Sequence, residues 1–238
     1  MKTHLLLLGA VALLLAGCQT RSISDSGYRR NGPAQGVPTS QYTGELNELD
    51  VLGIERQVSV TDDQIIQALD NAAQVRIRKG SRVLVVQSGA QYPDEPMLEG
   101  LNEFVTVTPF SGQPHQFERE TYHRALRYAA ARGGCETVIC YWGILESARQ
   151  SFDSKAVSWV PLVGSIVPDE HQHMRIRLKV AIVDVRTGNW SLFSPEPFSH
   201  QAVSARLGRE RSDQAQVKRL KEQAYAAAAR DVLKMYAN

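Results

Sequence analysis

The heptapeptide Met174-Arg175-Ile176-Arg177-Leu178-Lys179-Val180 alternates strictly between apolar and basic side chains. Successive side chains of a β-strand point to opposite faces, so this pattern predicts an antiparallel strand with one buried face and one solvated face. We expect the strand to continue through Val183, to turn at Arg186-Thr187-Gly188-Asn189 and to return over residues 190–193. The second half of the sheet is therefore predicted to be an antiparallel meander.

Before this meander, helical and extended patterns alternate along the sequence. Thr61-Asp62-Asp63-Gln64 fits a capping box, and it precedes a helical apolar face made of Ile65, Ile66, Leu69, Ala72 and Ala73. Residues 82–89 contain four consecutive apolar side chains and predict a buried central strand. The other expected elements are a short helix to about residue 101, a strand over 104–108 closed by Pro109, a helix over about 116–131 and a strand over 137–142.

The chain ends in a long helical pattern, from about Asp213 to Tyr236. Its apolar residues recur at spacings of three and four and form one narrow stripe, made of Val217, Leu220, Ala224, Ala228, Val232 and Met235. Together these patterns predict a single α/β (α+β) domain over residues 48–238. We expect a mixed sheet whose second half is an antiparallel meander, helices packed on that sheet and a long C-terminal helix.

A resemblance follows from this order of elements and from two stretches, Gly134-Cys135-Glu136-Thr137-Val138-Ile139 and Asp184-Val185-Arg186-Thr187-Gly188-Asn189-Trp190. The domain is similar to the periplasmic domains of the curli-secretion lipoprotein, the lipoprotein activators of penicillin-binding proteins and the TolB N-terminal domain. The likeness covers about residues 60–236 and implies a fold, but no function by itself. The chain departs from the secretion pore, because Pro161 and Gly164 interrupt the apolar centre of the insertion 146–173, where membrane-spanning strands of about 9–11 residues would be needed.

The N-terminus has the pattern of a targeting segment. Lys2 precedes an apolar run, Leu5–Leu15, that is shorter than the roughly 20 residues of a transmembrane helix. The run ends in Leu15-Ala16-Gly17-Cys18, which resembles the lipobox of bacterial lipoproteins. The resemblance implies that residues 1–17 are a signal peptide and that Cys18 becomes the first residue and carries acyl chains such as palmitate.

The residue after the cysteine bears on location. It is Gln19 and not aspartate, which by the same resemblance implies an anchor in the outer membrane with the domain facing the periplasm. The alternative is an ordinary secretory signal whose cleavage site happens to precede a cysteine.

Residues 18–47 are predicted to be a lipidated flexible tether, because Ser, Gly, Pro, Gln, Asn and Arg dominate up to about residue 46. Some 28 such residues would span roughly 30 Å as a coil and about 90 Å when extended. Lys2 is the only charged residue of the signal peptide, so 26 basic and 25 acidic residues remain, a net charge of +1. This near-neutral balance gives no support to a nucleic-acid partner.

Two cysteines remain in the predicted domain, Cys135 and Cys140. If both lie on one strand, about 16 Å separates them and no disulfide can join them directly. We therefore expect buried free thiols.

The sequence contains few candidates for catalysis. His171 and His173 lie two apart beside Asp169 and Glu170, which can begin a zinc site of a peptidase-like hydrolase. No H-E-x-x-H pattern is present, and an exposed polar loop explains the same residues. Ser88 follows the buried strand but has no G-x-S-x-G flanks, so a turn is the expected role. No glycine-rich nucleotide-binding motif occurs, and no cofactor besides the lipid is expected.

The best candidate for an interaction surface is the row Arg175, Arg177 and Lys179, three cations on one strand face. Such a row can bind an acidic protein, a lipid head group or an anionic wall polymer, whereas the simpler interpretation is a solvated face with gatekeeping charges. Trp159, in the apolar part of the insertion, can serve partner binding or self-assembly, or lie in an edge strand. The expected function is a non-catalytic envelope lipoprotein that binds a partner, and a metal-dependent aminopeptidase or other peptidase using His171 and His173 is the alternative.

Overall fold

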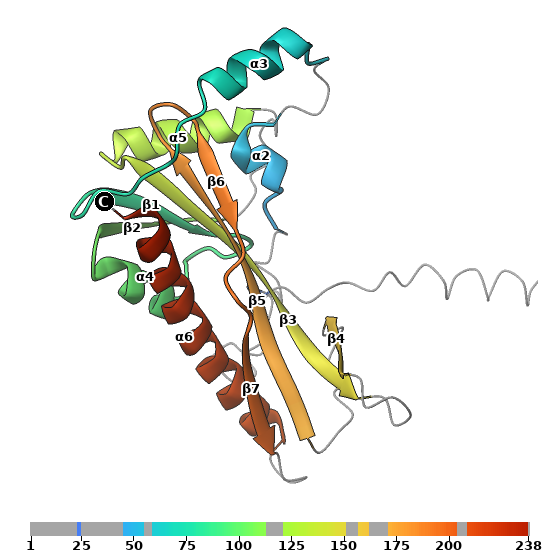
Figure 1. Ribbon diagram of the computed structural model, residues 1–238. Coiled ribbons are helices and arrows are strands. Elements are labelled where there is room, and N and C mark those ends of the chain that lie inside the picture. The colour runs from blue at the N-terminus through green and yellow to red at the C-terminus, as the bar shows by residue number, and fades with distance from the viewer. Residues whose placement is uncertain are drawn as a thin grey trace, which may run out of the picture.

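A computed structural model describes residues 23–24, 45–54, 59–112, 121–150, 157–161, 171–203 and 209–237. Figure 1 shows the elements in chain order. Their bounds are α2 Glu48–Leu52, α3 Asp62–Asp70, β1 Arg82–Gln87, α4 Glu95–Asn102, β2 Thr106–Phe110, α5 Tyr122–Arg132, β3 Thr137–Gln150, β4 Val157–Pro161, β5 His171–Asp184, β6 Trp190–Phe193, β7 Phe198–Val203 and α6 Arg209–Tyr236.

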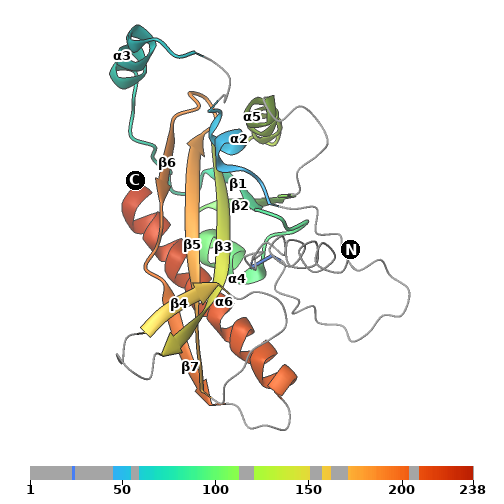
Figure 2. The same cartoon turned by 90° about the vertical axis from the view of Figure 1, so that its right-hand side faces the viewer.

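The strands form one mixed sheet with the order β2-β1-β3-β5-β6. Strand β1 is parallel to both β2 and β3, and β3 is antiparallel to β5, which is antiparallel to β6. The long strands β3 and β5 run beyond the rest of the sheet, where β4 pairs with β3 and β7 pairs with β5 (Figure 2). This architecture confirms the predicted α+β class, including the mixed sheet and its antiparallel second half.

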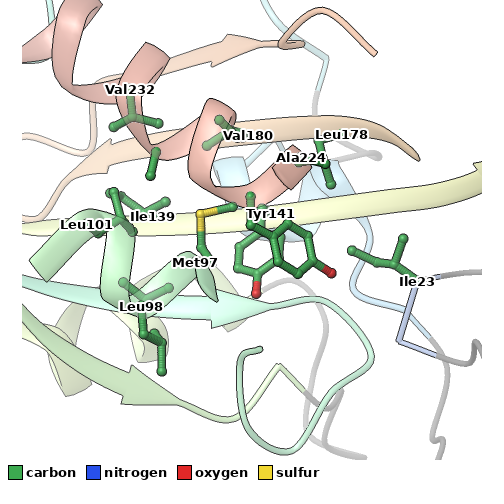
Figure 3. Packing of buried hydrophobic residues seen from close by; sticks show 14 of the residues in the cluster. Ile23, Met97, Leu98, Leu101, Ile139, Tyr141, Leu178, Val180, Ala224 and Val232 are labelled. Carbon is green, nitrogen blue, oxygen red and sulfur yellow. The ribbon is translucent and has the colours of Figure 1, made fainter. Parts of the chain in front are cut away.

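Helices cover both faces of the sheet, because the strand side chains alternate between two apolar layers. Val83 and Val85 of β1 point to the layer covered by α4 and α6, whereas Leu84 and Val86 point to the layer covered by α2 and α5. Figure 3 shows the first layer, where residues of α4 and α6 meet those of β3 and β5. The prediction of helices packed on the sheet is therefore confirmed, with a helical layer on each side.

The C-terminal helix α6 confirms most of the predicted stripe. Val217, Leu220, Ala224, Ala228 and Val232 are all buried. Met235, the last residue of the predicted stripe, is 45% exposed, so the buried part of the stripe ends before it. Additional buried residues of the helix, Tyr225 and Ala229, broaden the packed face.

Helix α3 begins at the predicted capping box, but it does not pack on the sheet. The Thr61 side chain accepts a hydrogen bond from the Gln64 backbone, and the Gln64 side chain accepts one from the Thr61 backbone, which confirms the capping box. The helix ends at Asp70, before Ala72 and Ala73, and none of its residues is buried. The predicted apolar face thus holds for Ile65, Ile66 and Leu69 but not for Ala72 and Ala73, and α3 stands away from the sheet instead of packing on it (Figure 1).

Other boundaries shift in ways that the pairing explains. The second strand runs over Thr106–Phe110 and contains Pro109, which was expected to close it. Because β2 is an edge strand, a proline without an N–H is tolerated there. Strand β3 continues to Gln150, beyond the predicted end at residue 142. Helix α5 begins at Tyr122, and the structure does not describe residues 116–120 of the predicted helix.

Cys135 and Cys140 are buried free thiols, as predicted.

Candidate functional site

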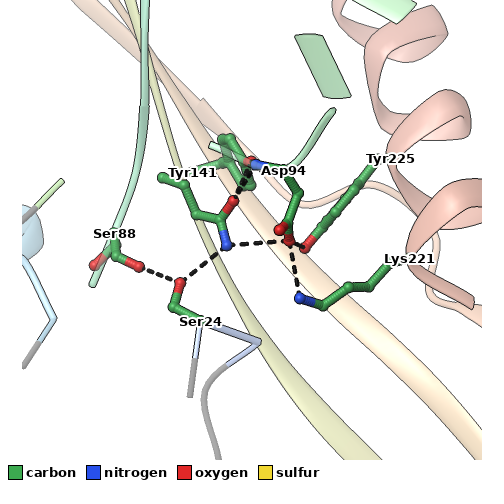
Figure 4. Close-up of polar contacts among 7 residues, drawn as sticks. Ser24, Ser88, Asp94, Tyr141, Lys221 and Tyr225 are labelled. Carbon is green, nitrogen blue, oxygen red and sulfur yellow. Dashed lines mark hydrogen bonds and ion pairs between the residues drawn. The ribbon is translucent and has the colours of Figure 1, made fainter. Parts of the chain in front are cut away.

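A cluster of polar side chains lies at the carboxyl end of β1 (Figure 4). At its centre is Asp94, the residue before α4. Its Oδ2 atom accepts hydrogen bonds from Lys221 Nζ at 2.9 Å and from the Tyr225 hydroxyl at 2.8 Å, both on α6. Gln87 Nε2, at the end of β1, donates to the same oxygen at 3.2 Å. The carboxylate therefore joins β1, α4 and α6.

The two tyrosines of this cluster act as neutral donors. The Tyr141 hydroxyl donates to Gln87 Oε1 at 2.6 Å, and the Asp94 backbone N–H donates to the same oxygen at 2.7 Å. Burial raises the pKa of Tyr141 and of Tyr225 well above the usual range, and the negative charge of Asp94 raises it further. Each phenol thus keeps its proton and can stabilise an acceptor.

The N-terminal part of the chain joins this cluster. Ser24 Oγ accepts a hydrogen bond from Gln87 Nε2 at 3.0 Å and donates one to the Ser88 carbonyl oxygen at 2.5 Å. The neighbouring Ile23 donates its backbone N–H to the Gly143 carbonyl at 2.9 Å, and its side chain is only 1% exposed. Ile23 and Ser24 of the predicted tether 18–47 therefore bind the body of the domain.

Ser88 also holds a second N-terminal residue. Its hydroxyl oxygen accepts a hydrogen bond from the Leu46 backbone N–H at 2.8 Å, while the Leu46 carbonyl accepts one from Trp142 Nε1 at 2.8 Å. Ser88 is buried at the end of β1, which agrees with its expected role in a turn. The chain meets Ser88 at Ser24 and again at Leu46.

The predicted cation row lies on one face of β5 but is ion-paired. Arg175 and Arg177 both contact Glu146 of β3, whose side chain is only 6% exposed. Lys179 forms an ion pair with Glu48 of α2. Two carboxylates, those of Glu146 and Glu48, therefore lie against the three cations of the row.

The other predicted site residues fall partly outside the described residues. Cys18 is not among the residues that the structure describes. Trp159 is in β4 opposite Ala148, so the interpretation as an edge strand agrees with the pairing, but its side chain is not described. His171 and His173 pair with Val203 and Gln201 through the backbone of β5, and their side chains are likewise outside the description. Among the side chains that are described, no three His, Cys, Asp or Glu residues lie close enough to hold a metal ion.

The apolar face of α3 is exposed, which the sequence pattern did not predict. Ile65, Ile66 and Leu69 are 49%, 56% and 70% exposed. The same helix carries Asp62, Asp63 and Asp70 and no cation. We call Ile65, Ile66 and Leu69 the α3 face. Its signal in the sequence was the helical pattern itself, which does not tell whether the apolar side packs on the core or on a partner.

Sequence reasoning did not predict that Ile23 and Ser24 bind the domain, or which residues bind them. Ile23 and Ser24 lie in a polar stretch, and Asp94 was expected only to open a helix. No local pattern connects these positions, because Ser24, Gln87 and Tyr225 are far apart in the sequence.

The family model of the YafT bacterial lipoprotein matches residues 47–235. The chain belongs to the YafT bacterial lipoprotein family. Membership confirms the coarser part of the prediction from the lipobox, that of a bacterial lipoprotein. Within the described part of this YafT-family chain, no helix has both the length and the apolar character that crossing a membrane requires. No curated protein matches the chain.

Two solved structures of PelC from Paraburkholderia phytofirmans are similar to this YafT-family chain. The PelC dodecamer in space group P6 is 13% identical, with a TM-score of 0.27, and the match covers 66% of this chain and 94% of the PelC chain. A single-substitution variant of that dodecamer, in space group C2, is 11% identical with a TM-score of 0.26, and the match covers 65% of this chain and 95% of the other.

Proposed function

We propose that acyl chains on Cys18 hold this lipoprotein at the periplasmic face of the outer membrane, where its domain binds another envelope protein and catalyses no reaction. The lipobox Leu15-Ala16-Gly17-Cys18, the following Gln19 and the membership of a lipoprotein family support the anchor. Several acyl chains give stable anchoring where one chain binds only marginally. The likeness of the domain to the curli-secretion lipoprotein, the penicillin-binding-protein activators and TolB remains a prediction.

The exposed α3 face is the observation that carries the proposed binding. The helix has a complete capping box, so its backbone is stabilised locally, yet its three large apolar side chains are 49–70% exposed. Complete burial of such a side chain stabilises a complex by roughly 1.5–3 kcal/mol relative to full exposure. An apolar helix face fits a hydrophobic groove, a common mode of protein recognition.

Charge indicates the chemistry of that groove. The sequence of α3 contains Asp62, Asp63 and Asp70 and no basic residue. Complementary potentials favour a groove with a basic rim, and the same acidic residues disfavour the anionic head groups of a membrane. The partner is thus a protein with an apolar groove bordered by Lys or Arg.

The cation row is the second candidate surface. Arg175, Arg177 and Lys179 were expected to bind an acidic protein or an anionic wall polymer. Their ion pairs with Glu146 and Glu48 compete with such a partner, so the row supports binding less well than the α3 face.

Site-specific photocrosslinking in cells tests the α3 face. A photoreactive residue in place of Ile66 should give one discrete crosslinked product, while the same residue in place of Gln67, which points about 100° away on the helix, should not. The triple substitution Ile65→Gln, Ile66→Gln, Leu69→Gln should abolish binding of that partner and leave the unfolding midpoint unchanged. Equal crosslinking from both positions contradicts the proposal, and a product of twice the mass of the chain identifies a second copy as the partner instead.

Fractionation tests the anchor. Cys18→Ser should release the domain as a soluble species or block its processing, because the acceptor thiol is gone. A Cys18→Ser protein that is correctly cleaved and still sediments with outer membranes contradicts anchoring through this residue.

A further inference from the structure

Ile23 fills a place in the core that is shaped for it. Its side chain lies in the layer beneath α4 and α6, near Tyr141 and Leu178 (Figure 3). A Cβ atom on Gly143 would be 2.7 Å from Ile23 Cδ1 and 2.8 Å from Leu178 Cδ2. Only glycine at position 143 leaves room for both side chains. Ile23 is therefore a packed core residue although it lies five positions after the predicted lipidated cysteine.

The neighbouring polar contacts fix the same segment. Ser24 bonds both to the side chain of Gln87 and to the carbonyl of Ser88, and Ser88 in turn holds Leu46. The chain segment between Ser24 and Leu46 therefore starts and ends at hydrogen bonds to the same residue, Ser88. Residues 25–45 then add nothing to the distance that the domain can move from an anchor at Cys18.

We propose that docking of Ile23 and Ser24 holds the domain close to the membrane, with the carboxyl ends of β1 and β2 nearer to the lipid head groups than their amino ends. The inference rests on the proposed lipidation of Cys18. Four residues separate Cys18 from Ile23, and the five Cα–Cα steps between them span at most about 18 Å in a fully extended chain. The distance between the membrane and the domain is therefore set by the segment 18–23, and not by the longer segment 18–47.

The surface at this edge suits the membrane interface. Tyr92 follows β1 and is 60% exposed, and Phe110 ends β2 and is 39% exposed. The two strand ends are joined by the hydrogen bond from the Gly89 N–H to the Gly112 carbonyl at 3.0 Å. Tyrosine side chains are enriched at the boundary between head groups and acyl chains, and phenylalanine side chains insert on the apolar side of that boundary. The docked segment and these aromatics thus lie at one edge of the sheet.

The opposite edge provides a matched reference position. Met235 is 45% exposed near the end of α6, where the Ile77 N–H donates to the Tyr236 carbonyl at 2.7 Å. Ile77 precedes β1, whose six residues span about 20 Å. A label at position 235 is therefore farther from the proposed membrane surface by about the length of this strand.

Fluorescence quenching on vesicles tests the orientation. The lipidated full chain, as Tyr92→Cys or Met235→Cys, is labelled with a maleimide fluorophore and bound to phosphatidylethanolamine and phosphatidylglycerol vesicles that carry a head-group quencher. Cys135 and Cys140 are buried and do not compete for the label. We expect several-fold stronger quenching at position 92 than at position 235. Equal quenching overturns the proposal.

Two variants separate docking from anchoring. Ten Gly and Ser residues inserted after Gln19 leave the docked residues intact and lengthen the tether, so the label at 92 should lose its excess quenching. Ile23→Asp should have the same effect by releasing the segment, whereas Ile23→Val should not. A preference for position 92 that survives the insertion overturns the short tether. Failure of the unmodified chain to float with the vesicles overturns the anchor at Cys18, and with it the orientation.

Discussion

The backbone N–H of Ile23 donates a hydrogen bond to the carbonyl oxygen of Gly143, in the middle of the longest strand pair of the sheet. This contact places a residue of the predicted tether in the core of the domain. It also makes Gly143 a position where a single methyl group has a predictable effect.

Gly143→Ala should destabilise the domain by about 1–3 kcal/mol, because the added Cβ overlaps the side chains of Ile23 and Leu178. The free energy of unfolding in urea measures the effect. The matched control is the same substitution in an Ile23→Ala background, where the vacated space should absorb part of the methyl group. Additive free energies in this double-mutant cycle would contradict direct packing of Ile23 on position 143.

Arg175→Ala should cost about 3 kcal/mol of unfolding free energy, since it leaves the buried carboxylate of Glu146 with a weaker partner. Arg177→Ala is the control. Its side chain is 49% exposed and lies 3.5 Å from the same carboxylate, so its removal should cost no more than about 1 kcal/mol. Equal losses for the two variants would contradict the different roles that burial assigns to them.

The buried phenols predict a loss of stability at alkaline pH. Burial raises the pKa of Tyr141 and Tyr225 above the ordinary value of about 10, so between that value and the raised one the unfolded chain loses these protons while the folded chain keeps them. The unfolded state then binds fewer protons, and the free energy of unfolding falls as pH rises above about 10.

Tyr141→Phe removes one of these groups. Over the pH range from about 10 to 11.5, its free energy of unfolding should fall less steeply than that of the unmodified chain, by about 0.7 kcal/mol per pH unit near pH 10 and approaching about 1.4 kcal/mol per pH unit near pH 11.5. Urea unfolding at several pH values measures both slopes. Identical slopes would show that the Tyr141 phenol ionises equally in the two states.

Zinc analysis tests the hydrolase alternative. If His171 and His173 begin a metal site, untagged protein purified with zinc in the buffer should retain one zinc per chain, and His171→Ala, His173→Ala protein should lose it. The non-catalytic proposal expects no stoichiometric zinc in either protein. Retained zinc that the double substitution removes would contradict that proposal.

Local chemistry accounts for the parts of the fold that the sequence predicted. The alternation around Ile176 and Leu178, the capping pair Thr61 and Gln64 and the turn at Gly188 each depend on neighbours within a few positions. Gly188 has a φ of 79°, a conformation that glycine adopts without steric cost. Periodicity likewise identified most of the buried stripe of α6, except in its last turn, where Met235 is exposed.

The site depended on contacts that no local pattern encodes. Arg175 was correctly assigned to the face opposite Ile176, but only the register of β3 and β5 places Glu146 across from it and neutralises much of the row. The capped helix α3 has the apolar pattern of a core helix, and only its position away from the sheet exposes that pattern.

The sequence by itself determined the anchor motif, the identity of most helices and strands, and which side chains share a face, because these properties repeat with the period of the backbone. The tertiary structure alone decided which faces are covered. It packed Ile23 against Gly143, brought Ser24 and Leu46 to Ser88, and left the α3 face open. Burial and ion pairing depend on distances between residues far apart in the chain, and those distances exist only after the sheet has formed.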